Sequence, residues 1–181
     1  LSETIQYPAF PTDQVERLRT QLLTGLAIRA QDTADMTDLI FNEILFAGHP
    51  FARPEDGWPQ TIQAITRKDL RDFHRRTFGP RGMVITIVGA VEPKKAVAAV
   101  QRALGGWKNP AQVERLEIPN QNPLRKMKRR VHKIAGKSQS DLVIGTIGPR
   151  RKDPEYLAAS LGNSILGQFG MMGRIGASVR E

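Results

Sequence analysis

Three histidines, His49, His74 and His132, are the side chains of this sequence best suited to bind a metal or to exchange protons near neutral pH. A helical zinc motif places two histidines no more than about four residues apart, so that both face one ion. No two of these histidines are that close, and the sequence contains no cysteine. The residues therefore predict no catalytic group, no metal ligand and no cofactor within this chain.

Each histidine has a structural explanation instead. His49 lies between Gly48 and Pro50, where a helix is expected to end, so we expect it to make a hydrogen bond in the loop. His74 lies beside two arginines on a basic helix, and we expect it to face solvent. His132 lies in a basic segment and is expected to be structural as well.

A glycine-rich stretch, residues 167–173, is the second candidate site. Its sequence, Gly-Gln-Phe-Gly-Met-Met-Gly, lacks the Lys-Ser/Thr pair of a phosphate-binding loop. One interpretation is a turn between helices that needs glycine backbone angles. The other is a loop that contacts substrate, in which methionines would offer adaptable apolar contacts. The candidate residues are Gly167, Gly170, Met171, Met172 and Gly173.

The net charge of +9 raises the question of an acidic partner. Basic residues gather at 125–130 and 150–152, with only 6% aromatic residues in the chain and no nucleic-acid-binding motif. We therefore expect a solvated edge strand and a solvated loop, and no nucleic-acid partner. A basic nucleic-acid-binding module remains a third hypothesis for function. No run of 18 apolar residues is present, so we expect no membrane span.

Hydrophobic periodicity and capping signals predict a series of helices. The first opens at Thr12, with Val15, Leu18, Leu22 and Leu26 on one buried face. Further helices are predicted at 35–46, 59–64, from the capping box Thr66–Asp69 onward, 92–104, 154–166 and from 173.

Strands are predicted at 83–88, whose sequence is Met-Val-Ile-Thr-Ile-Val, and near 128–134 and 141–147. The intervening stretch, 109–124, contains three prolines and is predicted to be a linker. Helices that alternate with strands indicate a mixed α/β or α+β fold.

From Tyr7 onward, four segments in order resemble the insulinase/pitrilysin family of peptidases, which carry an inverted zinc motif, His-x-x-Glu-His. The segments are Tyr7–Pro11 with Val15–Arg19, Leu45–Phe51 with Gly57 and Ile65–Leu70, Phe78–Pro80 with Ile85–Gly89, and Asp153–Tyr156 with Asn163, Ile165–Gly167, Gly173–Ile175 and Arg180–Glu181. The resemblance implies α+β two-layer sandwiches with a mostly antiparallel sheet and helices on one face. It implies that 1–108 is the C-terminal half of a first peptidase-like domain, 109–124 the linker, and 125–181 the truncated start of a second. The chain also begins without Met, and we expect it to be a fragment of a longer protein.

The resemblance also identifies where zinc-site glutamates would lie. In active members, two glutamates seven residues apart follow the motif, and here those positions fall on Leu18 and Gly25. Neither residue can coordinate a metal. The resemblance therefore favours a non-catalytic member, with zinc expected only in a partner or an upstream domain.

The leading hypothesis is a non-catalytic half of a zinc-peptidase assembly that completes the proteolytic chamber and helps to bind peptide substrate. Its partners would be a zinc-bearing homologous subunit or domain, in a homo- or heterodimer, and the peptide. The alternative is a fragment of an active zinc metalloendopeptidase whose His-x-x-Glu-His motif lies upstream of residue 1.

Overall fold

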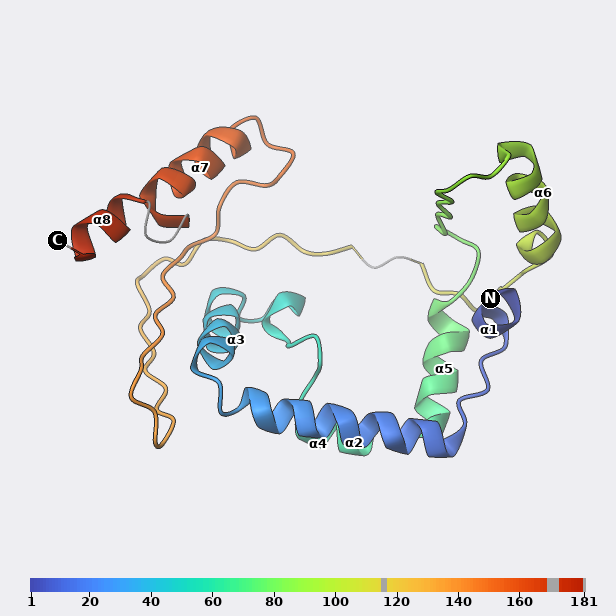
Figure 1. The fold of residues 1–181 in the computed structure, drawn as a ribbon, viewed down its shortest axis with the longest axis horizontal. Helices are drawn as coiled ribbons and strands as arrows, with labels where there is room; N and C mark the ends of the chain where they lie inside the picture. The colour runs from blue at the N-terminus through green and yellow to red at the C-terminus, as the bar shows by residue number, and fades with distance from the viewer. Residues whose placement is uncertain (115–116, 169–172, 181) are drawn as a thin grey trace. The chain divides into compact units, whose positions relative to one another are not determined.

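A computed structural model describes residues 1–114, 117–168 and 173–180. The elements in order are α1 (Ser2–Gln6), α2 (Thr12–Arg29), α3 (Thr33–Leu45), the short 3-10 turn η1 (Pro50–Ala52), α4 (Pro59–Ala64), α5 (Arg67–Thr77), α6 (Pro93–Leu104), α7 (Tyr156–Asn163), the wide helical turn η2 (Ser164–Gln168) and α8 (Arg174–Arg180) (Figure 1). None of the helices in the described part is long and apolar enough to cross a membrane.

The described residues form two compact units, residues 1–36 with 53–118 and residues 37–52 with 119–181. In the first unit, Arg19 of α2 donates a 2.7 Å hydrogen bond to the carbonyl of Ile65 and another to that of Ile62, which fixes α2 against α4. Ser2 of α1 donates to the carbonyl of Ala103 at the end of α6, at 2.7 Å. These bonds join helices that lie far apart in the sequence.

In the second unit, α3 is the element against which other segments lie. Gln121 donates a 3.0 Å bond to the carbonyl of Leu45, one of the last carbonyls of α3. A methyl group at Gly145 would come within 2.8 Å of the ring of Phe41, so the extended segment around Gly145 passes close to α3. Gly48 adopts the left-handed backbone with φ of 82°, as expected of a glycine just after a helix.

The predicted α+β sandwiches are wrong for the described residues, which are about half helical and contain no β-strand. The segments 83–88, 128–134 and 141–147, predicted as strands, have no regular secondary structure and form no ladder. In the first of them Val84 is 87% exposed and Val88 is 92% exposed. A segment forms a β-strand only when a neighbouring strand exchanges backbone hydrogen bonds with it. No described segment does so here.

The predicted buried face of α2 is also only partly buried. Leu26 is buried, with 6% exposure, but Leu18 on the same face is 55% exposed. The buried apolar side chains among the described residues are Leu26 and Leu45. The sequence patterns therefore predicted the positions of the helices better than they predicted which of their residues are buried.

Candidate functional site

The two positions where the resemblance places zinc-site glutamates both lie on α2. Leu18 is half exposed, and a methyl group at Gly25 would meet no atom within 4 Å. The nearest carboxylate, Glu16, accepts a 2.9 Å hydrogen bond from Arg19, and this bond lowers the pKa of Glu16. That carboxylate is therefore paired with the arginine that fixes α2 against α4.

Zinc does not fit the residues of α2. A zinc site needs three protein ligands with lone pairs, and leucine and glycine side chains have none. In the part of the chain that the structure describes, no group of three His, Cys, Asp or Glu side chains lies close enough together to hold a metal ion. No chemical step through a metal can be assigned to these residues.

His49 makes the loop hydrogen bonds that its position predicted. The ring is 7% exposed, its Nδ1 accepts from the backbone N–H of Phe51 at 3.1 Å, and its Nε2 lies 2.9 Å from the carbonyl of Pro119. Because Nδ1 accepts, Nε2 carries the proton and donates to that carbonyl. Both ring nitrogens are thus occupied by backbone groups, which confirms the structural prediction.

The prediction that His74 faces solvent is wrong. Its Nε2 lies 2.7 Å from the carbonyl of Ile5, and its ring stacks on Phe78 with centroids 4.9 Å apart. The basic neighbours Arg75 and Arg76 suggested an exposed helix face, but the ring lies at the point where α1 meets α5. His132 is exposed, and it lies in the extended segment without a ladder.

The glycine-rich loop is described only at its two ends. Gly170, Met171 and Met172 lie outside the described residues. Gly167 lies within the wide turn η2, and Gly173 is buried just before α8. A methyl group at Gly173 would lie 2.6 Å from the Cα of Gly167 and 2.9 Å from the carbonyl oxygen of Leu166. The two backbones approach each other so closely that only glycine fits at Gly173.

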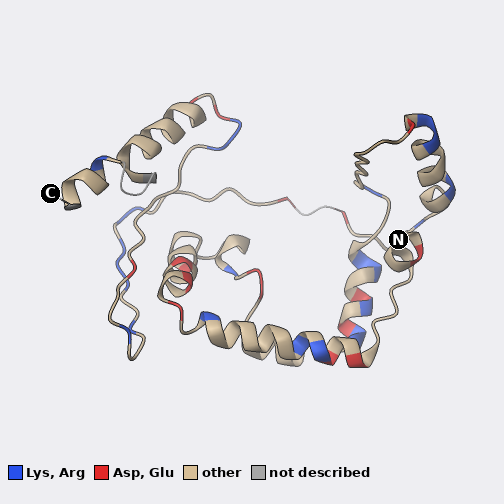
Figure 2. Cartoon of the chain, viewed as in Figure 1, with Lys and Arg blue, Asp and Glu red and all other residues tan. Residues whose placement is uncertain are grey.

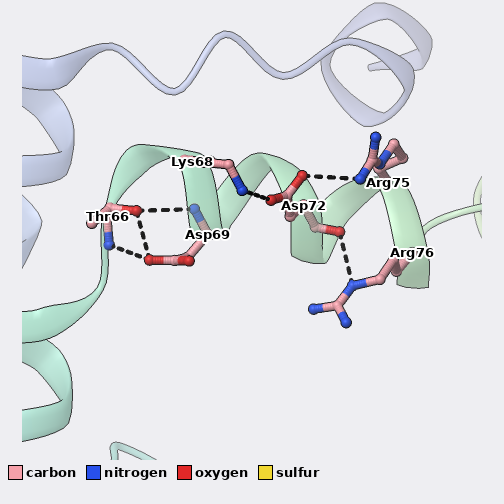
Figure 3. Close-up of polar contacts among 6 residues, drawn as sticks. All are labelled: Thr66, Lys68, Asp69, Asp72, Arg75 and Arg76. Carbon is pink, nitrogen blue, oxygen red and sulfur yellow. Dashed lines mark hydrogen bonds and ion pairs between the residues drawn. The ribbon is translucent and has the colours of Figure 1, made fainter.

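Helix α5 carries a charged cluster that sequence analysis did not single out (Figure 3). Asp72 pairs with Lys68 at 2.6 Å and with Arg75 at 3.1 Å, and Asp69, Asp72, Arg75 and Arg76 border a shallow hollow. The hydrogen bond from Lys68 lowers the pKa of Asp72, and the hydrogen bond from Thr66 lowers that of Asp69. Carboxylates held ionised in this way are poor proton donors, so the cluster does not supply a general acid. The i, i+3 and i, i+4 spacing of opposite charges was the signal for it.

Comparison with known proteins decides the family. Residues 64–181 match the sequence profile of the family described as "Peptidase M16 inactive domain". The chain belongs to this family. The resemblance to insulinase/pitrilysin peptidases and the assignment to the inactive type are thereby confirmed.

Three relatives illustrate the range of this M16 inactive domain. It is 36% identical over 93 residues, 51% of the chain, to a protein named uncharacterized zinc protease in Mycobacterium leprae, of which it covers 21%. It is 24% identical over 173 residues, 93% of the chain, to cytochrome b-c1 complex subunit 1 of Bos taurus, of which it covers 35%. A crystal structure of a peptidase M16 inactive domain from Pseudomonas fluorescens matches with 25% identity and a TM-score of 0.74, over 99% of this chain and 42% of that one. The chain thus spans less than half the length of each of these relatives.

Proposed function

We propose that this M16 inactive domain forms the non-catalytic half of a zinc-peptidase assembly. It pairs with a zinc-bearing homologous subunit or domain, completes the proteolytic chamber and helps to bind peptide substrate. The observation that carries the proposal is the match of residues 64–181 to the inactive-domain profile. Leu18 and Gly25, at the positions of the family's zinc-site glutamates, point the same way.

The names of the relatives support a role within an assembly. One is named a zinc protease, and another is named a subunit of the cytochrome b-c1 complex. A domain shared by both kinds of protein is one that functions beside other domains or subunits. On this proposal the partner binds the zinc ion, and this chain contributes a binding surface but no catalytic group.

The peptide is proposed to lie against the glycine-rich loop. Gly167 and Gly173 bring two stretches of backbone into close approach. Gly170, Met171 and Met172 complete the candidate set between them. Unbranched methionine side chains can fit many peptide side chains, as a chamber that binds unfolded substrates requires.

The test uses the full-length protein and a zinc-bearing homologue, purified separately. We expect the full-length protein to contain no stoichiometric zinc in this domain, each protein to cleave a fluorogenic peptide weakly alone, and cleavage to appear on mixing. Stoichiometric zinc bound by residues of this domain would reject the proposal. Cleavage by the homologue alone at the rate of the mixture would also reject it.

The second candidate is a fragment of an active zinc metalloendopeptidase. It is favoured by the 36% identity to a protein named a zinc protease, of which this chain covers only 21%. A His-x-x-Glu-His motif upstream of residue 1, together with peptide cleavage by the full-length chain that a chelator abolishes, would establish it. Without that motif the first proposal stands alone.

A further inference from the structure

A run of unpaired basic side chains follows Leu124. We call this segment, residues 125–133, the cationic arm; its basic residues are Arg125, Lys126, Lys128, Arg129, Arg130 and Lys133. No Asp or Glu occurs between Glu117 and Asp141, so nothing nearby in the sequence neutralises it. Figure 2 shows this run of basic residues on the extended chain, whereas acidic and basic residues alternate along α5.

The cations of the arm are exposed and have no anionic partner among the described residues. Elsewhere in the described part, several basic side chains are paired: Arg19 with Glu16, Lys68 and Arg75 with Asp72, and Lys95 with Glu92. The arm differs from these paired sites in carrying six basic side chains with no acidic residue among them. A charge run of this kind is expected to be solvated, but a run with no acidic residue among its cations also attracts an anionic partner.

The backbone of the arm sets the spacing of these charges. Residues 127–134 belong to no helix or turn, and Figure 1 draws them as part of an elongated trace. In an extended chain, alternate side chains lie on the same side, about 6.6–6.8 Å apart. Lys128 and Arg130 thus share one side, and Arg129 and Lys133 lie on the other. An extended peptide with carboxylates at alternate positions has the same repeat.

We propose that the cationic arm binds acidic segments of peptides. The inference rests on the proposed function, because that function brings peptides to this domain, and it adds the class of peptide that the domain prefers. Each cation would pair with a carboxylate of the peptide at the protein surface. Such exposed pairs are individually weak, so the preference depends on several of them acting together.

Nucleic acid and membrane fit the arm less well. No Phe, Trp or Tyr occurs between Trp107 and Tyr156, so the arm has no ring on which bases could stack. Membrane-surface segments that insert do so through the apolar face of a helix, and this segment is extended with Met127 and Val131 as its exposed apolar residues. A carboxylate-rich peptide needs neither feature.

The test measures binding of three fluorescent peptides of equal length to the full-length protein at low salt. One peptide alternates Glu with Ala, the second has Gln in place of Glu, and the third has Lys. The variant is Lys128→Gln, Arg129→Gln and Arg130→Gln together. The control carries Lys94→Gln, Arg102→Gln and Lys108→Gln together. It also removes three positive charges, at exposed residues that form no ion pair within the described part of the chain.

We expect the Glu peptide to bind more tightly than the Gln peptide, and its binding to weaken as salt rises. The arm variant should lose about tenfold in affinity for the Glu peptide, whereas the control should lose about twofold or less. Equal losses in both variants would overturn the inference, because net charge alone would then explain the binding. Equal binding of all three peptides would overturn it while leaving the proposed function intact, and binding of none would remove both.

Two further probes separate the other partners. Single-stranded DNA and vesicles containing anionic lipid are titrated under the same conditions. If the DNA or the vesicles bind more tightly than the Glu peptide, and this binding is lost in the arm variant, the assignment of a peptide partner is overturned. Weaker binding of both would support it.

Discussion

At the scale of single residues, several polar side chains of this domain bond backbone groups of distant elements. Arg19 donates to the carbonyls of Ile62 and Ile65, and His49 bonds the carbonyl of Pro119. These groups are engaged in structure and are not free to act on a substrate.

The capping box of α5 allows a direct test of one such residue. The hydroxyl of Thr66 accepts from the N–H of Asp69 at 3.2 Å, while a carboxylate oxygen of Asp69 accepts from the N–H of Thr66 at 2.8 Å. We expect Thr66→Ala to lower the free energy of unfolding by about 1 kcal/mol, because the helix loses its cap. Thr20→Ala, in the interior of α2, should change it by less than about 0.5 kcal/mol. Urea unfolding of the chain measures both, and equal effects would contradict the role of the cap.

The same substitution should change the response to acid. The hydrogen bond from Thr66 is the largest cause that lowers the pKa of Asp69 below its ordinary value of 3.8. A carboxylate with a depressed pKa stabilises the fold above its unfolded-state pKa, and the contribution is lost as the pH falls through the folded-state pKa. Thr66→Ala should therefore raise the pKa of Asp69 and reduce the fall in stability below pH 3.8. Carboxyl NMR titration measures the pKa, and an unchanged value would show that the hydroxyl is not its cause.

His49 gives a second prediction at this scale. His49→Ala leaves the N–H of Phe51 and the carbonyl of Pro119 without their partner, and should cost about 1–3 kcal/mol of unfolding free energy. His132→Ala is the matched control, because His132 is exposed, and should cost less than about 0.5 kcal/mol. Thermal or urea unfolding compares the two. An equal loss of unfolding free energy for His132→Ala and His49→Ala would show that the hydrogen bonds of the His49 ring are not the cause of the loss.

At the scale of elements, helices could be predicted from the sequence because their signals are local. Pro59 and the capping box Thr66–Asp69 lie at the beginnings of α4 and α5, and α4 has the predicted bounds Pro59–Ala64. A cap or a proline acts within one turn of helix, so it needs nothing distant in the sequence. The same holds for α6, predicted to end at Leu104 before Gly105.

Strands could not be predicted in this way. The run 83–88 is rich in β-branched residues, but this indicates only that the segment suits a sheet. Whether it becomes a strand depends on a partner elsewhere, and none of the described segments pairs with it. For the candidate site, the glycine positions of the loop were visible in the sequence, whereas the close approach of Gly173 to Gly167 was not. That approach depends on the relative positions of the backbones at both glycines, which no local sequence pattern determines.

The glycine-rich loop gives the prediction at this scale. Gly173→Ala would place a methyl group 2.6 Å from the Cα of Gly167, so the loop or α8 must shift. We expect it to lower the unfolding free energy by about 1–3 kcal/mol and to weaken peptide binding by the full-length protein. Gly162→Ala, where a methyl group meets no atom within 4 Å, is the control and should be neutral or slightly stabilising in α7. If Gly173→Ala lowers stability but leaves peptide affinity unchanged, Gly173 contributes to folding and not to peptide binding.

At the scale of the whole molecule, surface charge and exposed apolar residues dominate. The chain carries a net charge of +9, and many of its large apolar side chains are exposed, including Val84 and Met127. Apolar surface of this extent is usual where a domain meets another domain or subunit. This exposed apolar surface supports the proposal that the domain pairs with a homologous subunit or domain.

The segments without regular secondary structure give the last prediction, which concerns the chain Leu1–Glu181 as a whole. Among the described residues, the amides of 84–88 and 127–134 make no backbone hydrogen bond, whereas those inside α2 and α5 are bonded within their helices. Amides without a bond exchange with solvent at nearly the unfolded rate, so hydrogen exchange followed by mass spectrometry should show rapid exchange in both segments and protection in the helices. Unpaired extended segments can also pair between molecules, so the measurement is repeated over a dilution series. Protection of 84–88 that persists on dilution and equals that of α2 would show that the segment pairs within the chain, and its description as unpaired would then be wrong.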